Sequence, residues 1–229
     1  MAFATAGRSM KLYWGSGSAP CWRVMAVLEE KGLGKYDSKL ISFDKNETKS
    51  EEIMKLNPRG EVPTFVIGEI VINESLATCL YLEDTYKSSG VQLIPSDCPK
   101  KAQVLQRTFE APGFMKKGLE DLGYLYMEGD VNEEEMKEKK TSLKAELALW
   151  EGYLKAAGGD YLTGQDFTMA DCIFFPVLAV MVRLGLALRP TFPELGKYYE
   201  TVSKRPSIMK TWPPHWKGTE GKKWLNNVC

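Results

Sequence analysis

Histidine is nearly absent from this chain of 229 residues, which contains only His215. A metal site made of several histidines is therefore excluded, and a serine–histidine catalytic triad would have to use this one residue. Two prolines precede His215 and a tryptophan follows it, a pattern typical of a surface loop. We therefore expect no metal ion and no catalytic role for this histidine.

Paired cysteines are missing as well. The five cysteines are odd in number, and their spacing matches neither a disulfide framework nor a zinc site. They are Cys21, Cys79, Cys98, Cys172 and Cys229. This usage is typical of a reducing compartment, so we expect a cytoplasmic protein.

The chain also lacks net charge and long apolar runs. Thirty acidic and thirty basic residues balance, so neither nucleic acid nor an anionic membrane is an expected partner. No apolar run reaches the roughly eighteen residues that predict a membrane span. Residues 1–10 lack the apolar core of a secretory signal. An apolar content of 44% is that of an ordinary globular protein with a sizeable core.

Residues 1–87 have the pattern of an α/β domain. Strands are expected at residues 11–14, 39–43, 65–67 and 70–72, the last two joined by a hairpin turn at Gly68-Glu69. Helices are expected from Pro20 and over residues 50–56 and 75–86. The order βαβαββα implies a parallel crossover and an antiparallel edge. We predict a thioredoxin-like domain.

The composition changes after residue 87. Residues 88–98 contain serine, glycine and proline and predict a linker. No strand pattern follows, so we predict a helical bundle domain over residues 99–229. One apolar stripe of its core is expected at Leu143, Leu147, Trp150 and Leu154. An apolar helix is expected to follow over residues 172–188, started by a capping box at Thr168–Asp171.

A serine lies where the first strand is expected to meet the first helix, in Ser18-Ala19-Pro20-Cys21. The helix start stabilises a thiolate, and a hydroxyl there can donate a hydrogen bond to it. A thioredoxin-type redox motif has cysteine at this position. Because this chain has serine there, Ser18 and Cys21 cannot act as a dithiol, but the hydroxyl can still activate a thiol brought by a ligand. Two alternatives stay open: Ser18 is only a helix cap, or Tyr13 or Ser16 supplies the hydroxyl. Cys21 is expected to be a buried, inert thiol.

Two further segments have the chemistry of a binding site. Pro63 opens a strand, and a cis bond to Val62 would turn the Val62 backbone groups outward, where an extended peptide can pair with them. Ser75, as the cap of the third helix, would offer amide hydrogens to a carboxylate, and Glu74 would attract an ammonium group. A carboxylate beside an ammonium is the backbone of an amino acid. Lys49, before the second helix, could hold another carboxylate.

Three segments, in this order and spacing, resemble the cytosolic glutathione transferases. They are Ser18–Arg23, Asn57–Pro63 and Asn73–Ser75. The likeness extends over nearly the whole chain, including the capping box of the helical half. The chain most resembles the rho class and is also similar to the delta, zeta and omega classes.

The resemblance implies a role for each residue of the predicted site. Ser18 would face the sulfur of glutathione. Val62, before Pro63, would pair with the cysteinyl backbone, and Glu74 and Ser75 would bind the γ-glutamyl end. Glutathione would be a co-substrate, and no permanently bound cofactor is expected.

The glycyl carboxylate of glutathione needs a partner here that differs from the one in the delta enzymes. Delta enzymes have histidines where this chain has Thr48 and Gly60. Lys49 aligns with a lysine of the omega enzymes that approaches the tripeptide, so the resemblance leaves this carboxylate to Lys49 or Lys45.

The function implied is detoxification, in which the glutathione thiolate is conjugated to hydrophobic electrophiles in a pocket between the two domains. Candidates for the pocket wall are Phe114, Met115, Leu122 and Tyr126. One alternative is a glutathione-dependent reductase or isomerase, although omega-like chemistry uses cysteine where this chain has Ser18. The other is a non-catalytic ligand-binding or scaffold protein. The resemblance also implies a homodimer.

Overall fold

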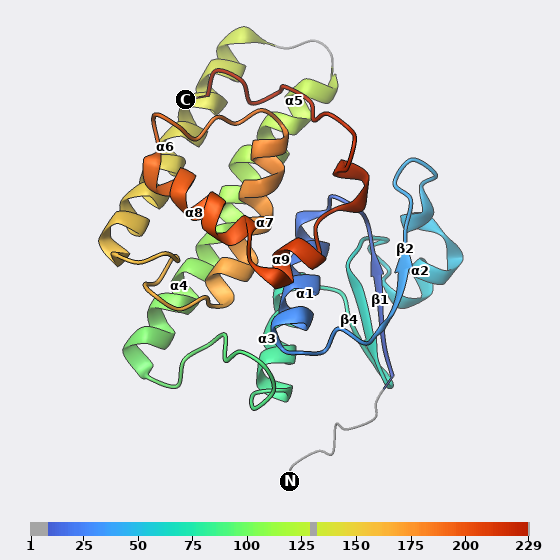
Figure 1. Ribbon diagram of the computed structural model, residues 1–229. Coiled ribbons are helices and arrows are strands. Elements are labelled where there is room, and N and C mark those ends of the chain that lie inside the picture. The colour runs from blue at the N-terminus through green and yellow to red at the C-terminus, as the bar shows by residue number, and fades with distance from the viewer. Residues whose placement is uncertain (1–8, 129–131, 229) are drawn as a thin grey trace. The chain divides into compact units, whose positions relative to one another are not determined.

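The computed structural model describes residues 9–128 and 132–228 (Figure 1). Contacts divide these residues into two compact units. One contains the residues up to Gln92 together with Lys210–Lys217, and the other contains Leu93–Met209 and the residues from Gly218 onward. The boundaries predicted from the sequence, 1–87, 88–98 and 99–229, stay predictions. The segment Lys210–Lys217 belongs by its contacts to the first unit, although the sequence places it in the helical domain.

The first unit is built on a four-stranded sheet with the order β2-β1-β3-β4. Its elements are β1 (Met10–Trp14), α1 (Ala19–Glu30), β2 (Asp37–Leu40), η1 (Glu47–Lys49), α2 (Glu51–Leu56), β3 (Thr64–Ile67), β4 (Ile70–Ile72) and α3 (Ser75–Thr85). β1 pairs with β2 in parallel and with β3 antiparallel, and β4 pairs antiparallel with β3. The predicted βαβαββα order and the thioredoxin-like fold are confirmed.

The second strand lies earlier in the chain than the sequence predicts. β2 ends at Leu40, opposite Trp14 at the end of β1, so the expected strand over residues 39–43 is wrong in its bounds. Pairing stops here because β1 itself ends at Trp14 and the chain turns into the Gly15–Ser18 loop. Ile41 is still buried and donates to the Trp14 carbonyl (2.8 Å), whereas Phe43 is exposed.

The core of this unit lies between the sheet and the helices α1 and α3, which pack against each other. Fully buried side chains include Leu12, Phe65 and Ile67 of the strands and Val24, Val27 and Leu28 of α1. A buried ion pair joins the end of α1 to α3, since Lys31 Nζ lies 2.9 Å from Glu83 Oε2. These contacts fix α1, the helix that begins directly after Ser18.

Within the described part of the second unit, every regular element is helical apart from one bridge between Tyr161 and Gly164. The elements are α4 (Cys98–Met115), the π-helical turn η2 (Lys116–Asp121), α5 (Leu122–Glu128), α6 (Glu133–Ala157), α7 (Met169–Arg183) and α8 (Pro193–Ser203). The short helix α9 (Pro206–Lys210) leads into the segment grouped with the first unit, which contains η3 (Pro214–Trp216). The predicted helical bundle is confirmed.

The centre of the second unit is aromatic. Phe174 of α7 stacks on Trp150 (4.1 Å between ring centroids) and on Phe114 (4.9 Å). The predicted stripe of α6 is buried, and the predicted capping box starts α7. This helix ends at Arg183 rather than at residue 188, because the chain takes a left-handed turn at Gly185 (φ 99°). None of the described helices has both the length and the apolar character needed to cross a membrane.

Candidate functional site

Four loops of the first unit meet at one edge of the sheet. The strand register pairs Trp14 with Leu40, Tyr13 with Thr64 and Phe65 with Ile72. β1, β2 and β4 therefore end at the edge where β3 begins. The loops at this edge carry Ser18, Lys45, Lys49, Val62, Pro63, Glu74 and Ser75. The fold thus brings the predicted thiol-activating and glutathione-binding residues to the same edge.

Ser18 is the N-cap of α1. Its backbone is extended (φ −73°, ψ 113°), its N–H donates to the Gly15 carbonyl (3.2 Å), and its Oγ accepts from the Cys21 N–H (3.4 Å). Pro20 suits the first turn because its missing N–H would have no partner there. A serine hydroxyl has one hydrogen and two lone pairs, so accepting this bond leaves its hydrogen able to turn toward a ligand. Capping the helix and donating to a thiolate are therefore compatible roles.

Cys21 is a buried thiol in the first turn of α1. Its side chain is buried, and the Gly15 N–H donates to its Sγ (3.4 Å). Burial raises the pKa of the Cys21 thiol to about 11, and hydrogen bonds with Ser18 and Gly15 offset only part of that rise. The thiolate is the nucleophilic form, so a raised pKa keeps this thiol inert. The prediction that Cys21 is buried is confirmed, and its raised pKa agrees with an inert thiol.

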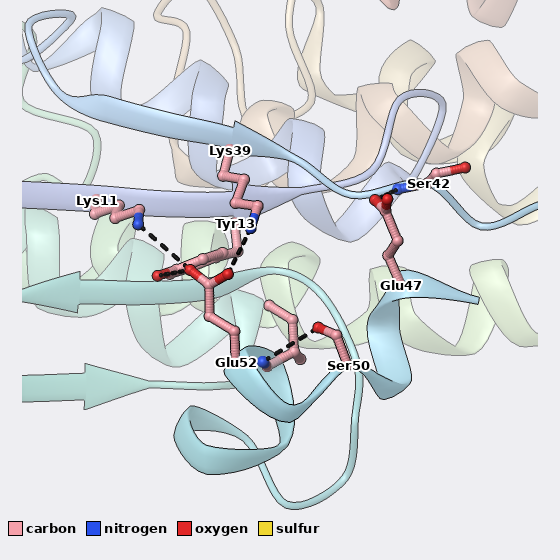
Figure 2. Close-up of polar contacts among 8 residues, drawn as sticks. Lys11, Tyr13, Lys39, Ser42, Glu47, Ser50 and Glu52 are labelled. Atoms are coloured by element: carbon pink, nitrogen blue, oxygen red, sulfur yellow. Dashed lines mark hydrogen bonds and ion pairs between the residues drawn. The ribbon is translucent and has the colours of Figure 1, made fainter. Parts of the chain in front are cut away.

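Tyr13, the first alternative hydroxyl, has a hydrogen-bond acceptor on α2. Its Oη donates to Glu52 Oε1 (2.8 Å), and Figure 2 shows the Glu52 carboxylate between Tyr13 and two lysines. Lys39 Nζ lies 2.5 Å and Lys11 Nζ 3.6 Å from this carboxylate. Hydrogen bonds from Lys39 and Tyr13 lower the pKa of the Glu52 carboxyl to about 2, so it stays ionised at neutral pH. The Tyr13 hydroxyl thus has an ionised acceptor on α2.

Ser16, the second alternative hydroxyl, also has a partner within the first unit. Its Oγ lies 2.5 Å from Nδ1 of His215, in the segment Lys210–Lys217. The two residues are 199 positions apart in the sequence, and no local pattern indicates this contact. Ser18 remains the candidate whose hydroxyl sits at the helix start.

The loop before β3 is organised by Asn57, which the sequence reasoning did not single out. Asn57 is buried, its Nδ2 donates to the Glu61 carbonyl (3.0 Å), and its Oδ1 accepts from the Arg59 N–H (3.1 Å). The Val62–Pro63 bond after this loop is cis, and Val62 is partly exposed. A polar residue directly before Pro58 was the only signal in the sequence that could have identified Asn57.

Glu74 and Ser75 begin α3, but in different roles from those predicted. Glu74 is the N-cap and Ser75 the first helical residue, so the expectation that Ser75 caps the helix is wrong. The Glu74 side chain caps no amide and is exposed, while the Ser75 Oγ accepts from Arg23 Nη1 (3.5 Å). Arg23 is buried on α1 and brings a positive charge beside Ser75. The sequence reasoning missed Arg23, although an arginine within the apolar start of a helix is a signal for a buried cation.

Lys49 lies beside the loop that leads to Pro63. Its Nζ donates to the Arg59 carbonyl (2.8 Å), and its side chain lies against Gly60, whose φ is +60°. The positive φ of Gly60 is the backbone conformation that favours glycine, and a side-chain carbon there would make the end of the Lys49 side chain move, since it would lie 2.7 Å from Lys49 Nζ. Lys45 is exposed in the turn after Ser42, within the same connection. Both lysines can be reached from solvent near this edge.

The four predicted pocket residues lie in the second unit and differ in exposure. Phe114 and Leu122 have no exposed surface, and Phe114 belongs to the aromatic core with Trp150. Met115 is half-buried, and Tyr126 is half-buried and stacks on Trp224 (5.6 Å). Met115 and Tyr126 are thus the two that offer surface to a ligand. Among the described residues, no cluster of histidine, cysteine, aspartate and glutamate side chains could hold a metal ion.

Two protein-family models match this chain, one within each unit. A model described as glutathione S-transferase, N-terminal domain, matches residues 17–85. A second model, glutathione S-transferase, C-terminal domain, matches residues 114–206. Together the two matches take in the start of α1, the cis proline, the start of α3 and most of the helical bundle.

Individual proteins resemble this chain over most of its length. The curated glutathione S-transferase A of Pleuronectes platessa is 44% identical over 225 residues, covering 96% of this chain and 99% of its own. The crystal structure of a glutathione S-transferase from the Antarctic clam Laternula elliptica is 45% identical, with a TM-score of 0.89 over 96% of this chain and all of that one. A probable maleylacetoacetate isomerase of Caenorhabditis elegans is 31% identical, covering 88% of this chain and 91% of its own.

Proposed function

The chain belongs to the glutathione S-transferase family, and on this premise we propose that Ser18 stabilises the thiolate of bound glutathione for its conjugation to hydrophobic electrophiles. The observation that carries this assignment is the position of Ser18. It caps α1 at the edge of the sheet where the loops of Pro63 and Glu74 also lie. The Tyr13 hydroxyl donates to Glu52 instead.

The chemistry follows from the acidity of a thiol. A free thiol has a pKa of about 8.5, so only a few per cent is thiolate at neutral pH. One charge-assisted hydrogen bond contributes about 1.5–3 kcal/mol, which lowers a pKa by about one to two units. The amide hydrogens at the start of α1 add positive potential at the same place. The resulting thiolate attacks the electrophile, and its lone pair forms the new carbon–sulfur bond as the leaving group departs.

We assign the rest of glutathione to the other loops of this edge. The Val62 backbone groups would pair with the cysteinyl residue. Ser75 and the first amides of α3 would hold the γ-glutamyl carboxylate, supported by the Arg23 charge, and Glu74 would hold the ammonium group. Lys49 or Lys45 would bind the glycyl carboxylate by charge.

The electrophile would lie against apolar side chains, for which Met115 and Tyr126 are the exposed candidates. Formation of a conjugate between glutathione and a generic aryl halide tests the activity. A rate above the uncatalysed reaction that saturates in both substrates supports it. Tight glutathione binding without turnover would favour a binding or scaffold protein on the same fold.

An isomerase is the second candidate, because one relative at 31% identity is named a probable maleylacetoacetate isomerase. Isomerisation by glutathione adds the thiolate to a double bond and removes it again, so it needs the same Ser18. Assaying a cis-configured unsaturated diacid with catalytic glutathione separates the two activities, since isomerisation consumes no glutathione. A disulfide reductase is disfavoured because Ser18 replaces the reactive cysteine and Cys21 is buried.

Replacing Glu74 or Ser75 with alanine is expected to raise the KM for glutathione about tenfold or more while changing kcat little. Each variant removes a group that holds the γ-glutamyl end and leaves the thiol site in place. Steady-state kinetics with glutathione as the varied substrate measures the effect. Glu69→Ala is the matched control, because this exposed glutamate lies in the hairpin turn at the other edge of the sheet. A fall confined to kcat would contradict the assignment.

We also propose that the protein is a cytoplasmic homodimer and that it belongs to the rho class. Apolar side chains are exposed on the edge strand β4, at Ile70 and Val71, and on α4, at Phe109. A two-fold dimer is the most frequent symmetric assembly and would cover such surfaces. Sedimentation at micromolar concentration is expected to give about twice the chain mass of 25.8 kDa. A stable, fully active monomer at that concentration would contradict the proposed homodimer.

A further inference from the structure

The segment Lys210–Trp216, which we call the strap, follows α1 back toward the Gly15–Ser18 loop. Three pairs of residues join the strap to α1 and its preceding loop: Lys210 with Glu29 (2.8 Å), Thr211 with Trp22 (2.8 Å) and His215 with Ser16 (2.5 Å). In this order the contacts pass from the last turn of α1 to the residues before its first turn. The strap therefore runs antiparallel to the helix and ends beside the loop that carries Ser18.

Three tryptophans anchor the strap. Trp22 is buried on α1, and the rings of Trp212 and Trp216 meet it edge-on, with centroids 5.1 and 5.7 Å away. Trp212 and Trp216 also meet each other at 5.7 Å. Edge-to-face aromatic contacts of this kind favour a defined geometry. These contacts restrain the backbone on both sides of His215, which lies between Trp212 and Trp216.

His215 contacts the loop before Ser18 in two ways. Its Nδ1 shares a hydrogen bond with Ser16 Oγ, and its ring lies against Gly17. A side-chain carbon at Gly17 would lie 2.9 Å from His215 Cε1, and the φ of Gly17 is +82°. Only glycine combines this backbone with this close approach.

Other groups hold the two ends of the same loop. The Gly15 N–H donates to Cys21 Sγ (3.4 Å), and the Phe43 ring lies against the face of Gly15. The Ser18 N–H donates to the Gly15 carbonyl (3.2 Å). Ser16 and Gly17, in the middle of the loop, are the residues that His215 contacts. The strap thus holds the central part of the loop that leads into Ser18.

We propose that His215 is a positioning residue for the thiol site, acting through Ser16 and Gly17 on the placement of the Ser18 hydroxyl. This inference rests on the proposed function of Ser18. Hydrogen-bond donation to a thiolate depends steeply on distance and angle, so a small shift of the loop weakens it. His215 itself need not touch glutathione.

Kinetics of the pair Ser16 and His215 test this role. His215→Ala is expected to lower kcat about three- to tenfold, as loss of one hydrogen bond implies, with little change in the KM for the electrophile. Ser16→Ala should have a similar effect, and the double variant should be no slower than the slower single variant. His215→Asn keeps a polar group near the position of Nδ1 and should restore most of the rate. Independent effects that add, or an asparagine variant as slow as the alanine variant, would overturn the proposal.

Amide hydrogen exchange separates this inference from the function on which it rests. Without glutathione, Gly17 and Ser18 are expected to exchange about threefold faster or more in His215→Ala. They should be unchanged in Lys217→Ala, which alters an exposed side chain just beyond the strap. Unchanged exchange in His215→Ala would overturn the positioning role even if Ser18 proves catalytic. Full activity of Ser18→Ala would instead overturn the proposed function, whatever the exchange rates show.

Discussion

Replacing Ser18 with alanine is expected to lower kcat for glutathione conjugation about ten- to a hundredfold. The variant loses one charge-assisted hydrogen bond to the thiolate, worth about 1.5–3 kcal/mol. The KM for glutathione should change less, because the contacts to the two ends of the tripeptide lie on other loops. Steady-state kinetics with an aryl halide, at saturating glutathione, measures the effect.

A loss of helix capping has to be separated from a loss of catalysis, since Ser18 is also the N-cap of α1. Ser50 offers a matched control, because it caps α2 in the same way, accepting from the Ile53 N–H (3.5 Å). Ser50→Ala should cost a similar amount of stability, about 1 kcal/mol, and leave kcat nearly unchanged. Full activity in Ser18→Ala together with loss of activity in Tyr13→Phe would show that the wrong hydroxyl has been assigned.

Replacing Asp171 with alanine is expected to lower the free energy of unfolding by about 3–5 kcal/mol. The carboxylate is fully buried and accepts hydrogen bonds from the N–H groups of Leu162 (3.0 Å) and Thr168 (2.8 Å) and from the Thr168 hydroxyl (3.1 Å). The variant leaves two buried N–H groups without this partner and removes the capping box of α7. Denaturant unfolding measures the change. Asp166→Ala, at an exposed site in the same loop, is the control and should have little effect.

The pH dependence of stability gives a second test of Asp171. Burial raises the pKa of this carboxyl from its ordinary 3.8 to about 6, although hydrogen bonds from Leu162 and Thr168 oppose the rise. The folded state therefore holds a proton that the unfolded state has released between about pH 4 and pH 6. The contribution of Asp171 to stability is full below pH 4 and falls as the pH rises through 6. Asp171→Asn, which does not titrate, should lack this fall, and an identical pH profile in both proteins would contradict the raised pKa.

Patterns local in the sequence predicted most of the fold. The glycine-led hairpin, Pro20 at the start of α1 and the capping box of α7 depend on neighbouring residues, and each is present in the structure. Apolar periodicity does not show where β2 ends, because that end depends on where the partner strand stops. Serine is a frequent cap, so the sequence predicts Ser75 as the cap of α3, whereas the backbone makes Glu74 the last residue before the helix.

The candidate site was predictable only where it depends on short motifs. Ser18 follows β1, Pro63 precedes β3 and Glu74 follows β4. These positions lie at the same edge of the sheet, so the three residues converge once the sheet topology is known. Contacts between distant residues left no such signal. The bond from Tyr13 to Glu52 spans 39 positions, and the contact of Ser16 with His215 spans 199. Only the tertiary packing decides which of the three hydroxyls remains available.

The most direct measurement is a titration of the thiol of enzyme-bound glutathione, followed by the ultraviolet absorbance of the thiolate, in the native protein and in Ser18→Ala. In the native protein the pKa should be lowered by about one to two units from the free value of about 8.5. In Ser18→Ala it should return most of the way to the free value. A bound thiol that titrates near 8.5 in the native protein, or with the same lowered pKa in both proteins, would contradict the role of Ser18.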